Sequence, residues 1–145
     1  MKRQEGAVGF YFTPDLERVA LIEKLKPNWQ KGLLNGIGGK LEPGESPAQA
    51  MKREFMEEAG LLINDFKQFA ALRSNIYTVH FFACTGTNVK NVKTLTEEKV
   101  DVYSVKLLDP KHCVYHLPWM IAMAQEFLRN GGKTEPYDIY EKRRL

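Results

Sequence analysis

The chain has 145 residues, of which 43% are hydrophobic, enough for the core of one domain of ordinary size. No run approaches the roughly 18 consecutive apolar residues of a membrane-spanning helix, and the start, MKRQEGAVGF, lacks the apolar segment of a signal peptide. The net charge of +3 is too small to indicate nucleic-acid binding by itself. We therefore expect one domain over residues 1–145, located in the cytoplasm, with no membrane anchor and no stable nucleic-acid binding. Cys84 and Cys113 lack metal-ligand spacing, which favours reduced, partly buried thiols.

Apolar periodicity and turn residues predict a mixed α/β layered domain. In chain order we expect strands at residues 6–12 and 19–22, a loop at 24–32, a short segment at 33–37 entering a glycine turn, a helix at 47–59, strands at 69–72 and 76–84, a polar loop at 85–95, a strand at 100–108, and a helix from 117 to the glycines at 131–132. The final EKRRL is expected to be solvated.

The helix at 47–59 has well-defined ends. Ser46 is a favourable N-cap, Pro47 suits the first helical position, and Gln49 completes a capping box. Gly60 is a natural stop.

Three carboxylates crowd one side of this helix. At about 100° per residue, Glu57 and Glu58 lie within about 60° of Glu54. The predicted core face lies beside them: Ala48, Met51, Phe55 and Ala59. Each like-charge pair on an exposed helix costs a few tenths of a kcal/mol. Two explanations fit: a solvated acidic face, or a divalent cation bound by hard oxygen ligands.

The charge distribution suits the second explanation. Residues 38–61 carry five acidic and three basic side chains, a net charge of −2. Because the whole chain has a net charge of +3, the other residues together carry +5. A metal ion in this acidic segment, serving an anionic substrate, would use both signs.

The spacing of the whole segment matches a known signature. Gly39 is followed after five residues by Glu45, and after seven more by REFMEEAGL at residues 53–61. This pattern resembles the Nudix box, and the chain resembles Nudix hydrolases in length and element order over most of its residues. The resemblance implies a mixed β-sheet sandwiched between helices (α/β/α). It also implies hydrolysis of a nucleoside diphosphate linked to another group, with Mg²⁺ or Mn²⁺ as cofactor.

The resemblance assigns roles to residues of the box. Arg53 would orient Glu57, and Lys40 would face a phosphate. The implied metal ligands are carboxylates and a backbone carbonyl from the glycine turn: Glu54, Glu57, Glu58 and Gly39.

The general base differs between Nudix subfamilies. It is either a glutamate of the box, here Glu54, or an acid from a later loop. Glu97 and Glu98 stand where such a loop acid would lie, and each also fits an ordinary loop charge.

The substrate is less strongly indicated. The segment LLNGIGGK resembles that of oxidised-purine nucleoside triphosphatases, in which an asparagine, here Asn35, contacts the base; a turn asparagine fits equally well. In MutT-type members an Asn or Asp just before the last helix reads the base, and this chain has His116 there. Trp119 would stack on a base or belong to the core. Tyr77 stands near the tyrosine of diadenosine polyphosphate hydrolases, and it also fits a strand position.

We therefore expect a Nudix pyrophosphohydrolase that converts a nucleoside triphosphate, with oxidised purines as one candidate, to the monophosphate and pyrophosphate. The alternatives are a hydrolase of diadenosine polyphosphates or other nucleotide derivatives, and a non-catalytic Nudix module that senses a nucleotide. The expected partner is a small-molecule nucleotide, and either a monomer or a homodimer fits the sequence.

Overall fold

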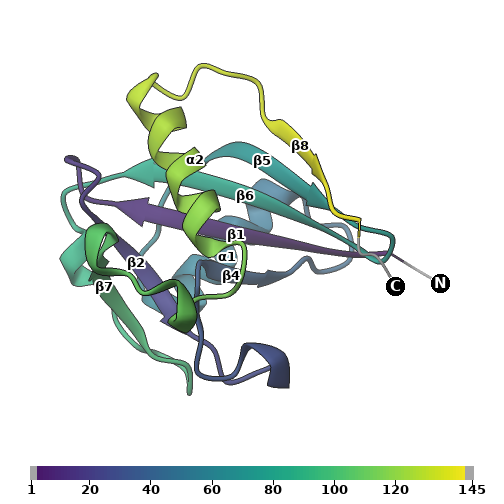
Figure 1. Cartoon of the computed structure of the whole chain (residues 1–145), viewed down its shortest axis with the longest axis horizontal. Helices are drawn as coiled ribbons and strands as arrows, with labels where there is room; N and C mark the ends of the chain where they lie inside the picture. The colour runs from purple at the N-terminus through teal and green to yellow at the C-terminus, as the bar shows by residue number, and fades with distance from the viewer. Residues whose placement is uncertain (1–2, 143–145) are drawn as a thin grey trace.

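The computed structural model describes residues 3–142 and shows a mixed β-sheet between two helices (Figure 1). The helices are α1 (Pro47–Ala59) and α2 (Leu117–Arg129). The strands are β1 (Gln4–Phe12), β2 (Arg18–Glu23), β3 (Leu34–Asn35), β4 (Ile37–Lys40), β5 (Lys67–Arg73), β6 (Tyr77–Thr85), β7 (Val100–Ser104) and β8 (Tyr137–Tyr140). The predicted mixed sheet between helices, an α/β/α sandwich, is confirmed.

Strand β1 organises the sheet. One of its edges pairs in parallel with β6 along its whole length. Its other edge is shared, because β4 pairs antiparallel with residues 6–9 of β1 and β2 with its last two residues. The sheet continues from β2 to β3 and β7, and from β6 through β5 to β8. This arrangement places Gly39 of β4 directly opposite Ala7, near the middle of the sheet.

Each face of the sheet is covered by one helix, and each interface is an apolar core. Helix α1 covers one face and α2 covers the opposite one (Figure 1). The α1 core includes buried residues of the helix and of the central strands: Ala7, Tyr11, Ile37, Met51, Phe55 and Phe82. The α2 core is rich in phenylalanine and leucine: Phe10, Leu21, Phe69, Phe81, Leu117 and Phe127.

Most predicted elements are present, with two differences. The strand predicted at 100–108 ends at Ser104, because residues 105–107 form a 3-10 turn. Strand β8 was not predicted, and it brings Glu141 of the C-terminal EKRRL into a half-buried position. Residues 143–145 of that segment lie outside the described part of the chain. Within residues 3–142, neither helix has the length and apolar character needed to cross a membrane.

Candidate active site

Helix α1 begins and ends as its sequence predicts. The Ser46 side chain accepts a hydrogen bond from the Gln49 backbone N–H at 3.1 Å, and the Gln49 side chain accepts one from the Ser46 N–H at 2.9 Å. Gly60 follows the helix with φ of 78°, the left-handed conformation that glycine adopts without strain. The capped helix therefore places its carboxylates at fixed positions above the sheet.

The buried side of α1 is broader than predicted. Met51, Phe55 and Ala59 are fully buried, as expected, but Ala48 is exposed and Ala50 is buried instead. The prediction for Ala48 is wrong because helical periodicity does not show how far the core extends, and Ala48 lies in the first turn of α1, outside the core. Ala50 lies on the acidic side of the helix, which therefore also packs against the sheet.

Glycines in β4 allow this close approach. A Cβ atom added to Gly39 would lie 2.7 Å from Oε1 and 2.8 Å from Oε2 of Glu54. A Cβ atom added to Gly38 would lie 1.8 Å from the Ala7 backbone oxygen. The Glu54 carboxylate thus lies directly against the β4 backbone, in a space that only glycine leaves open.

Arg53 joins the acidic side chains into one network. Its Nε donates to Glu45 at 2.7 Å, and its second terminal nitrogen donates to the other Glu45 oxygen at 2.9 Å. The first terminal nitrogen donates to Glu54 at 2.8 Å and to Glu57 at 3.2 Å. A further bond at 3.1 Å reaches the Lys40 backbone oxygen. The predicted contact between Arg53 and Glu57 is present, and Arg53 also ties α1 to β4.

The two-bond contact with Glu45 is the strongest in this network. Hydrogen bonds from Arg53 lower the pKa of the Glu45 carboxyl to about 2, and the same contact raises the pKa of Arg53. Glu45 was part of the recognised spacing but had no assigned role. In the structure it positions Arg53, which in turn positions the carboxylates of α1.

Glu58 is the one carboxylate of the cluster whose charge is poorly accommodated. Its Oε2 atom is buried and makes no hydrogen bond. Burial, and next the nearby charge of Glu54, raise the pKa of Glu58 to about 8, while Lys24 opposes this shift. A buried acceptor without a partner costs free energy that a cation at this position would recover.

Glu98 also reaches the cluster from its loop. It accepts hydrogen bonds from Lys24 Nζ at 3.1 Å and from the backbone N–H groups of residues 25 and 26 at 2.6 Å and 3.4 Å. Burial raises its pKa, but these donors together outweigh burial and leave the pKa below its usual value. Its charge also acts on Glu58. Glu97 is exposed, so only Glu98 of the two loop acids lies beside the helix.

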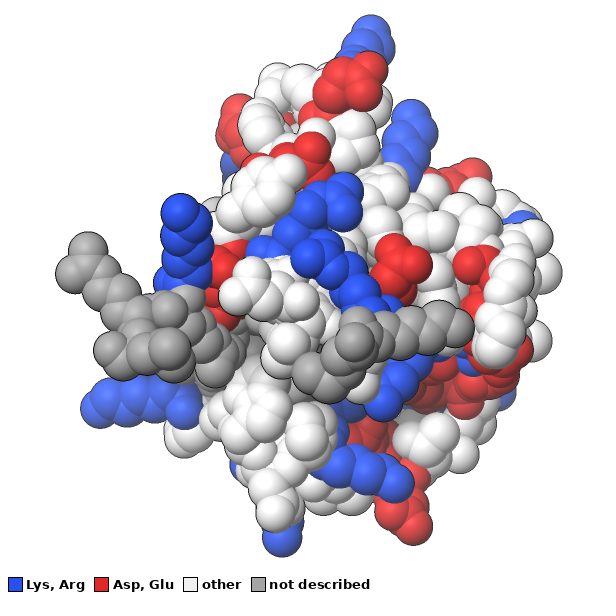
Figure 2. Space-filling model, turned by 90° about the vertical axis from the view of Figure 1, so that its right-hand side faces the viewer, with Lys and Arg blue, Asp and Glu red and all other residues white. Residues whose placement is uncertain are grey.

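The residues present suit a hard divalent cation. The donor set is carboxylate oxygen, one of these oxygens is buried without a partner, and a glycine backbone lies against the Glu54 carboxylate. Among residues 3–142, no three His, Cys, Asp or Glu side chains are already gathered in metal-binding geometry. Arg53 currently holds Glu54 and Glu57. Figure 2 shows that Lys and Arg side chains lie next to Asp and Glu side chains on one side of the molecule.

The predicted base-reading residues come from two segments that meet at β3. The Val114 N–H donates to the Leu34 oxygen at 2.9 Å, which brings the loop before α2 next to Asn35. Asn35 is 8% exposed, and its oxygen accepts a hydrogen bond from the Gly36 N–H at 2.8 Å. Its amide nitrogen donates to Gln30 at 3.2 Å. The Asn35 side chain is therefore buried and held by Gly36 and Gln30, as a turn residue would be, and its contact with a base stays a prediction.

His116 is buried and lies just before α2. It is 8% exposed, its Nδ1 makes no hydrogen bond, and its ring packs edge-on against Phe81 at 5.6 Å. Burial lowers the pKa of His116 to about 4, opposed by the charge of Glu141, so the ring is neutral near pH 7.

Exposed aromatic side chains surround His116. Trp119 is 41% exposed, so assigning it to the core is wrong; it projects outward one turn after Tyr115. Its ring lies 6.2 Å from His116, which itself lies 4.9 Å from the ring of Tyr115. Trp29 is 56% exposed and lies 6.4 Å from Tyr115. We call Trp29, Tyr115 and Trp119 the aromatic surface. Residue 29 was predicted to lie in a polar loop. The fold shows in addition that Trp29 contacts Tyr115, in the loop before α2.

Tyr77 occupies a different position. Its ring packs partly buried against the α2 core, and its hydroxyl donates to Glu141 at 2.6 Å. The strand interpretation of Tyr77 is therefore correct. A stacking role on a second base is not supported by this packing.

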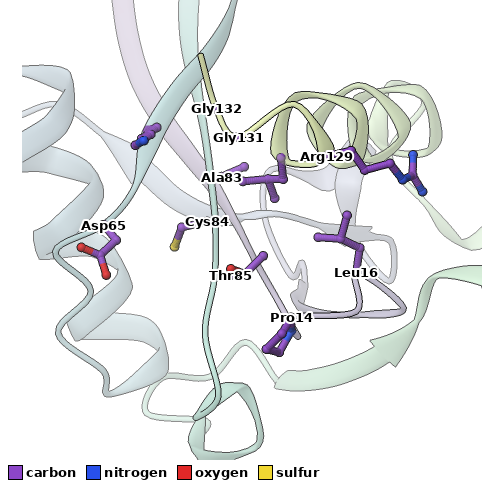
Figure 3. A pocket seen from close by; sticks show the side chains of 11 residues that line it. Pro14, Leu16, Asp65, Ala83, Cys84, Thr85, Arg129, Gly131 and Gly132 are labelled. Atoms are coloured by element: carbon purple, nitrogen blue, oxygen red, sulfur yellow. The ribbon is translucent and has the colours of Figure 1, made fainter. Parts of the chain in front are cut away.

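One hollow of the surface lies away from these residues. It has a volume of about 520 Å³ and lies where β6 ends and α2 stops, between Asp65, Thr85 and Arg129 (Figure 3). None of the carboxylates of α1 lines it. The chemistry-bearing residues gather instead where α1, β4 and the loop of Glu98 meet.

A mixed sheet between two helices, with glutamates of one helix set against a glycine strand, defines the Nudix class of domain. The NUDIX domain family matches residues 3–123, so the chain belongs to the Nudix family. Solved structures agree in fold. A MutT structure from work on Aliivibrio salmonicida and Vibrio cholerae has a TM-score of 0.70 at 22% identity, covering 87% of this chain and 100% of that one. A NUDIX hydrolase from Nitrosomonas europaea has a TM-score of 0.72 at 12% identity, covering 97% and 81%.

Two curated proteins are similar in sequence. A NAD-capped RNA hydrolase of Schizosaccharomyces pombe is 28% identical over 105 residues, 72% of this chain and 27% of that protein. An oxidized purine nucleoside triphosphate hydrolase of Danio rerio is 31% identical over 68 residues, 43% of this chain and 44% of that protein. The chain thus matches less than half the length of either relative. The predicted family and fold are confirmed, and substrate choice is a separate question.

Proposed function

We propose that the chain is a Nudix pyrophosphohydrolase that uses Mg²⁺ or Mn²⁺ to convert a nucleoside triphosphate to the monophosphate and pyrophosphate. The observation that carries this proposal is the network around Arg53, beside a buried Glu58 oxygen without a partner. Such an arrangement is costly without a cation. It suits a reaction in which charge on phosphate oxygens must be neutralised.

The cation-holding residues in this proposal are Glu54, Glu57, Glu58 and the Gly39 carbonyl. When bound, the cation neutralises phosphate charge and acidifies water. The chain's own groups do the positioning. Arg53 keeps two carboxylates in place, and the exposed Lys40 side chain, on the strand that Arg53 anchors, faces the phosphates.

The reaction requires a group that accepts a proton. Water attacks phosphorus, the bond to the leaving pyrophosphate oxygen breaks, and the proton of the water passes to a carboxylate. We assign this role to Glu54, because only its Oε1 accepts from Arg53, whereas both oxygens of Glu98 accept hydrogen bonds from Lys24 and two backbone N–H groups. In this assignment Glu98 positions the loop and contributes negative charge beside Glu58.

The aromatic surface with Asn35 and His116 supports a nucleobase as the group recognised beyond the phosphates. Aromatic rings stack on bases, and an amide offers both a donor and an acceptor to a base edge. The similarity to an oxidized purine nucleoside triphosphate hydrolase makes an oxidised purine the first candidate. We also propose a single domain over residues 1–145 acting on small nucleotides in the cytoplasm, which the two free, buried cysteines suit.

The proposal is tested by measuring kcat/KM with Mg²⁺ on a panel of normal and oxidised nucleoside triphosphates and diadenosine tetraphosphate. We expect the best triphosphate to exceed the dinucleotide by at least about tenfold, roughly 1.4 kcal/mol in barrier. Because Tyr77 is packed against the core, Tyr77→Ala should act through stability and leave this ratio unchanged. A preference for the dinucleotide, lost selectively in Tyr77→Ala, would mean that the substrate is of the dinucleotide class.

A further inference from the structure

The C-terminal strand reaches the region of the aromatic surface. Strand β8 pairs in parallel with β5, matching Arg73 with Tyr140, and the Glu141 N–H donates to the Arg73 oxygen at 2.8 Å. The backbone of Glu141 is therefore fixed by the sheet. In Figure 1, β8 lies at the edge of the sheet, beside β5.

The Glu141 carboxylate joins two tyrosines from separate parts of the chain. One of its oxygens accepts a hydrogen bond from the Tyr77 hydroxyl at 2.6 Å and another from the Tyr115 hydroxyl at 2.5 Å. These short distances are typical of hydroxyl groups bonded to an ionised carboxylate. Hydrogen bonding to Glu141 and burial accordingly raise the pKa of Tyr77, with burial the larger cause.

The two tyrosines differ in what holds them. Tyr77 is packed against the α2 core, so its ring is fixed without the hydroxyl contact. Tyr115 is 47% exposed on a loop, so apolar packing alone restrains its ring weakly. Yet Tyr115 stands between Trp29 and His116, with ring centroids 6.4 Å and 4.9 Å away. The hydroxyl contact with Glu141 therefore contributes to the orientation of Tyr115, which lies at the centre of the aromatic surface.

We propose that Glu141 is a positioning residue for nucleobase recognition: anchored by β8, it holds Tyr115 in the orientation that the base requires. The inference rests on the proposed nucleotide substrate, and it adds a part of the chain that lies outside the family match at residues 3–123. Glu141 acts through Tyr115 and does not touch the substrate.

The two tryptophans of the chain provide a direct readout of binding. The sequence contains only Trp29 and Trp119, and both belong to the aromatic surface. A base that stacks there should quench their fluorescence. Titration with a nucleoside triphosphate in Ca²⁺, chosen to slow turnover, gives a dissociation constant that does not depend on catalysis.

The test compares Glu141→Ala, Glu141→Gln and Tyr115→Phe with the wild type. Tyr140→Phe is the matched control, because Tyr140 is 71% exposed on the same strand and outside the contact. We expect Glu141→Ala and Tyr115→Phe to weaken nucleotide binding and raise KM about fivefold, with kcat within about twofold, as loss of a hydrogen bond predicts. Glu141→Gln should recover part of the loss, because its amide oxygen still accepts.

A second ligand separates positioning from general damage. An abasic deoxyribose triphosphate has the phosphates without the base, so its KM should be the same in all variants. Unchanged nucleotide binding in Glu141→Ala and Tyr115→Phe would overturn the inference, as would an equal loss for the abasic compound. Absence of turnover in a wild type that still binds nucleotide would instead overturn the proposed function, while wild type without nucleotide binding would overturn both.

Discussion

The most informative single residues of this protein are polar groups that the fold buries without a partner. Glu58 Oε2 and His116 Nδ1 are the two such atoms among the described residues. Glu58 lies where a cation is proposed, and His116 lies beneath the aromatic surface. Burying each of these atoms without a hydrogen-bond partner lowers the stability of the fold, and such costs are common at functional sites.

His116 leads to a prediction about stability and pH. Its pKa is about 4 in the folded protein and near 6.5 when unfolded, so the unfolded chain takes up the proton first as pH falls. The stability associated with a neutral His116 is therefore complete above about pH 6.5 and is lost as pH falls toward 4. We expect this group to remove about 2 kcal/mol between pH 7 and pH 5.

Urea unfolding of wild type and His116→Asn at both pH values measures this contribution. Asparagine does not titrate, so the variant should lose about 2 kcal/mol less than the wild type between the two values. Carboxylates such as Glu58 titrate in both proteins and cancel in the comparison. Equal losses would show that His116 is not held neutral by burial.

Among elements, the contact between α1 and β4 determines the site. The two adjacent glycines of β4 have different roles there. Gly38 makes room for the backbone of β1, whereas Gly39 makes room for the Glu54 carboxylate. The first contact belongs to the sheet and the second to the proposed chemistry.

This difference predicts opposite outcomes for two similar substitutions. Gly39→Ala should displace the flexible end of Glu54, so the fold persists while kcat falls about a hundredfold, the scale of a 1 Å misplacement. Gly38→Ala should instead lower the melting temperature strongly, because its Cβ meets a backbone oxygen that cannot move freely. Thermal unfolding and initial rates on both variants check this. A Gly39→Ala protein with normal kcat would separate the glycine from the reaction.

The elements also show which features a sequence can predict. The α1 boundaries followed from local chemistry, since Ser46, Gln49 and Gly60 act within a few residues of the helix ends. Strand β8 was not predicted, because its four residues are mostly exposed and gain their order from pairing with β5, distant in sequence. The aromatic surface was not predicted for the same reason, since it depends on contacts between residues distant in sequence. Trp29 and Tyr115 are brought together only by long-range pairing of β3 with the loop before α2.

Across the whole molecule, the proposed catalytic residues and the proposed base-recognition residues lie in different parts of the fold. The α1 side carries the carboxylates and Arg53, and the contact of Arg53 with Glu57 was predicted because both residues lie in one short segment. The contacts of Arg53 with Glu45 and Glu54 were not predicted. Base recognition is proposed where β3, the start of α2 and the C-terminal strand meet, from residues far apart in the chain. Substrate choice therefore depends on assembled surfaces that sequence spacing does not reveal.

The central claim, pyrophosphohydrolysis at the α1 carboxylates, is tested most directly by phosphorus NMR of the products formed from the preferred nucleoside triphosphate with Mg²⁺. We predict equal amounts of nucleoside monophosphate and pyrophosphate from the wild type. We also predict a rate at least about a hundredfold lower for Glu58→Gln, which removes the charge that the proposed cation requires while the fold persists. Release of orthophosphate with nucleoside diphosphate, or an undiminished rate in Glu58→Gln, would contradict the account.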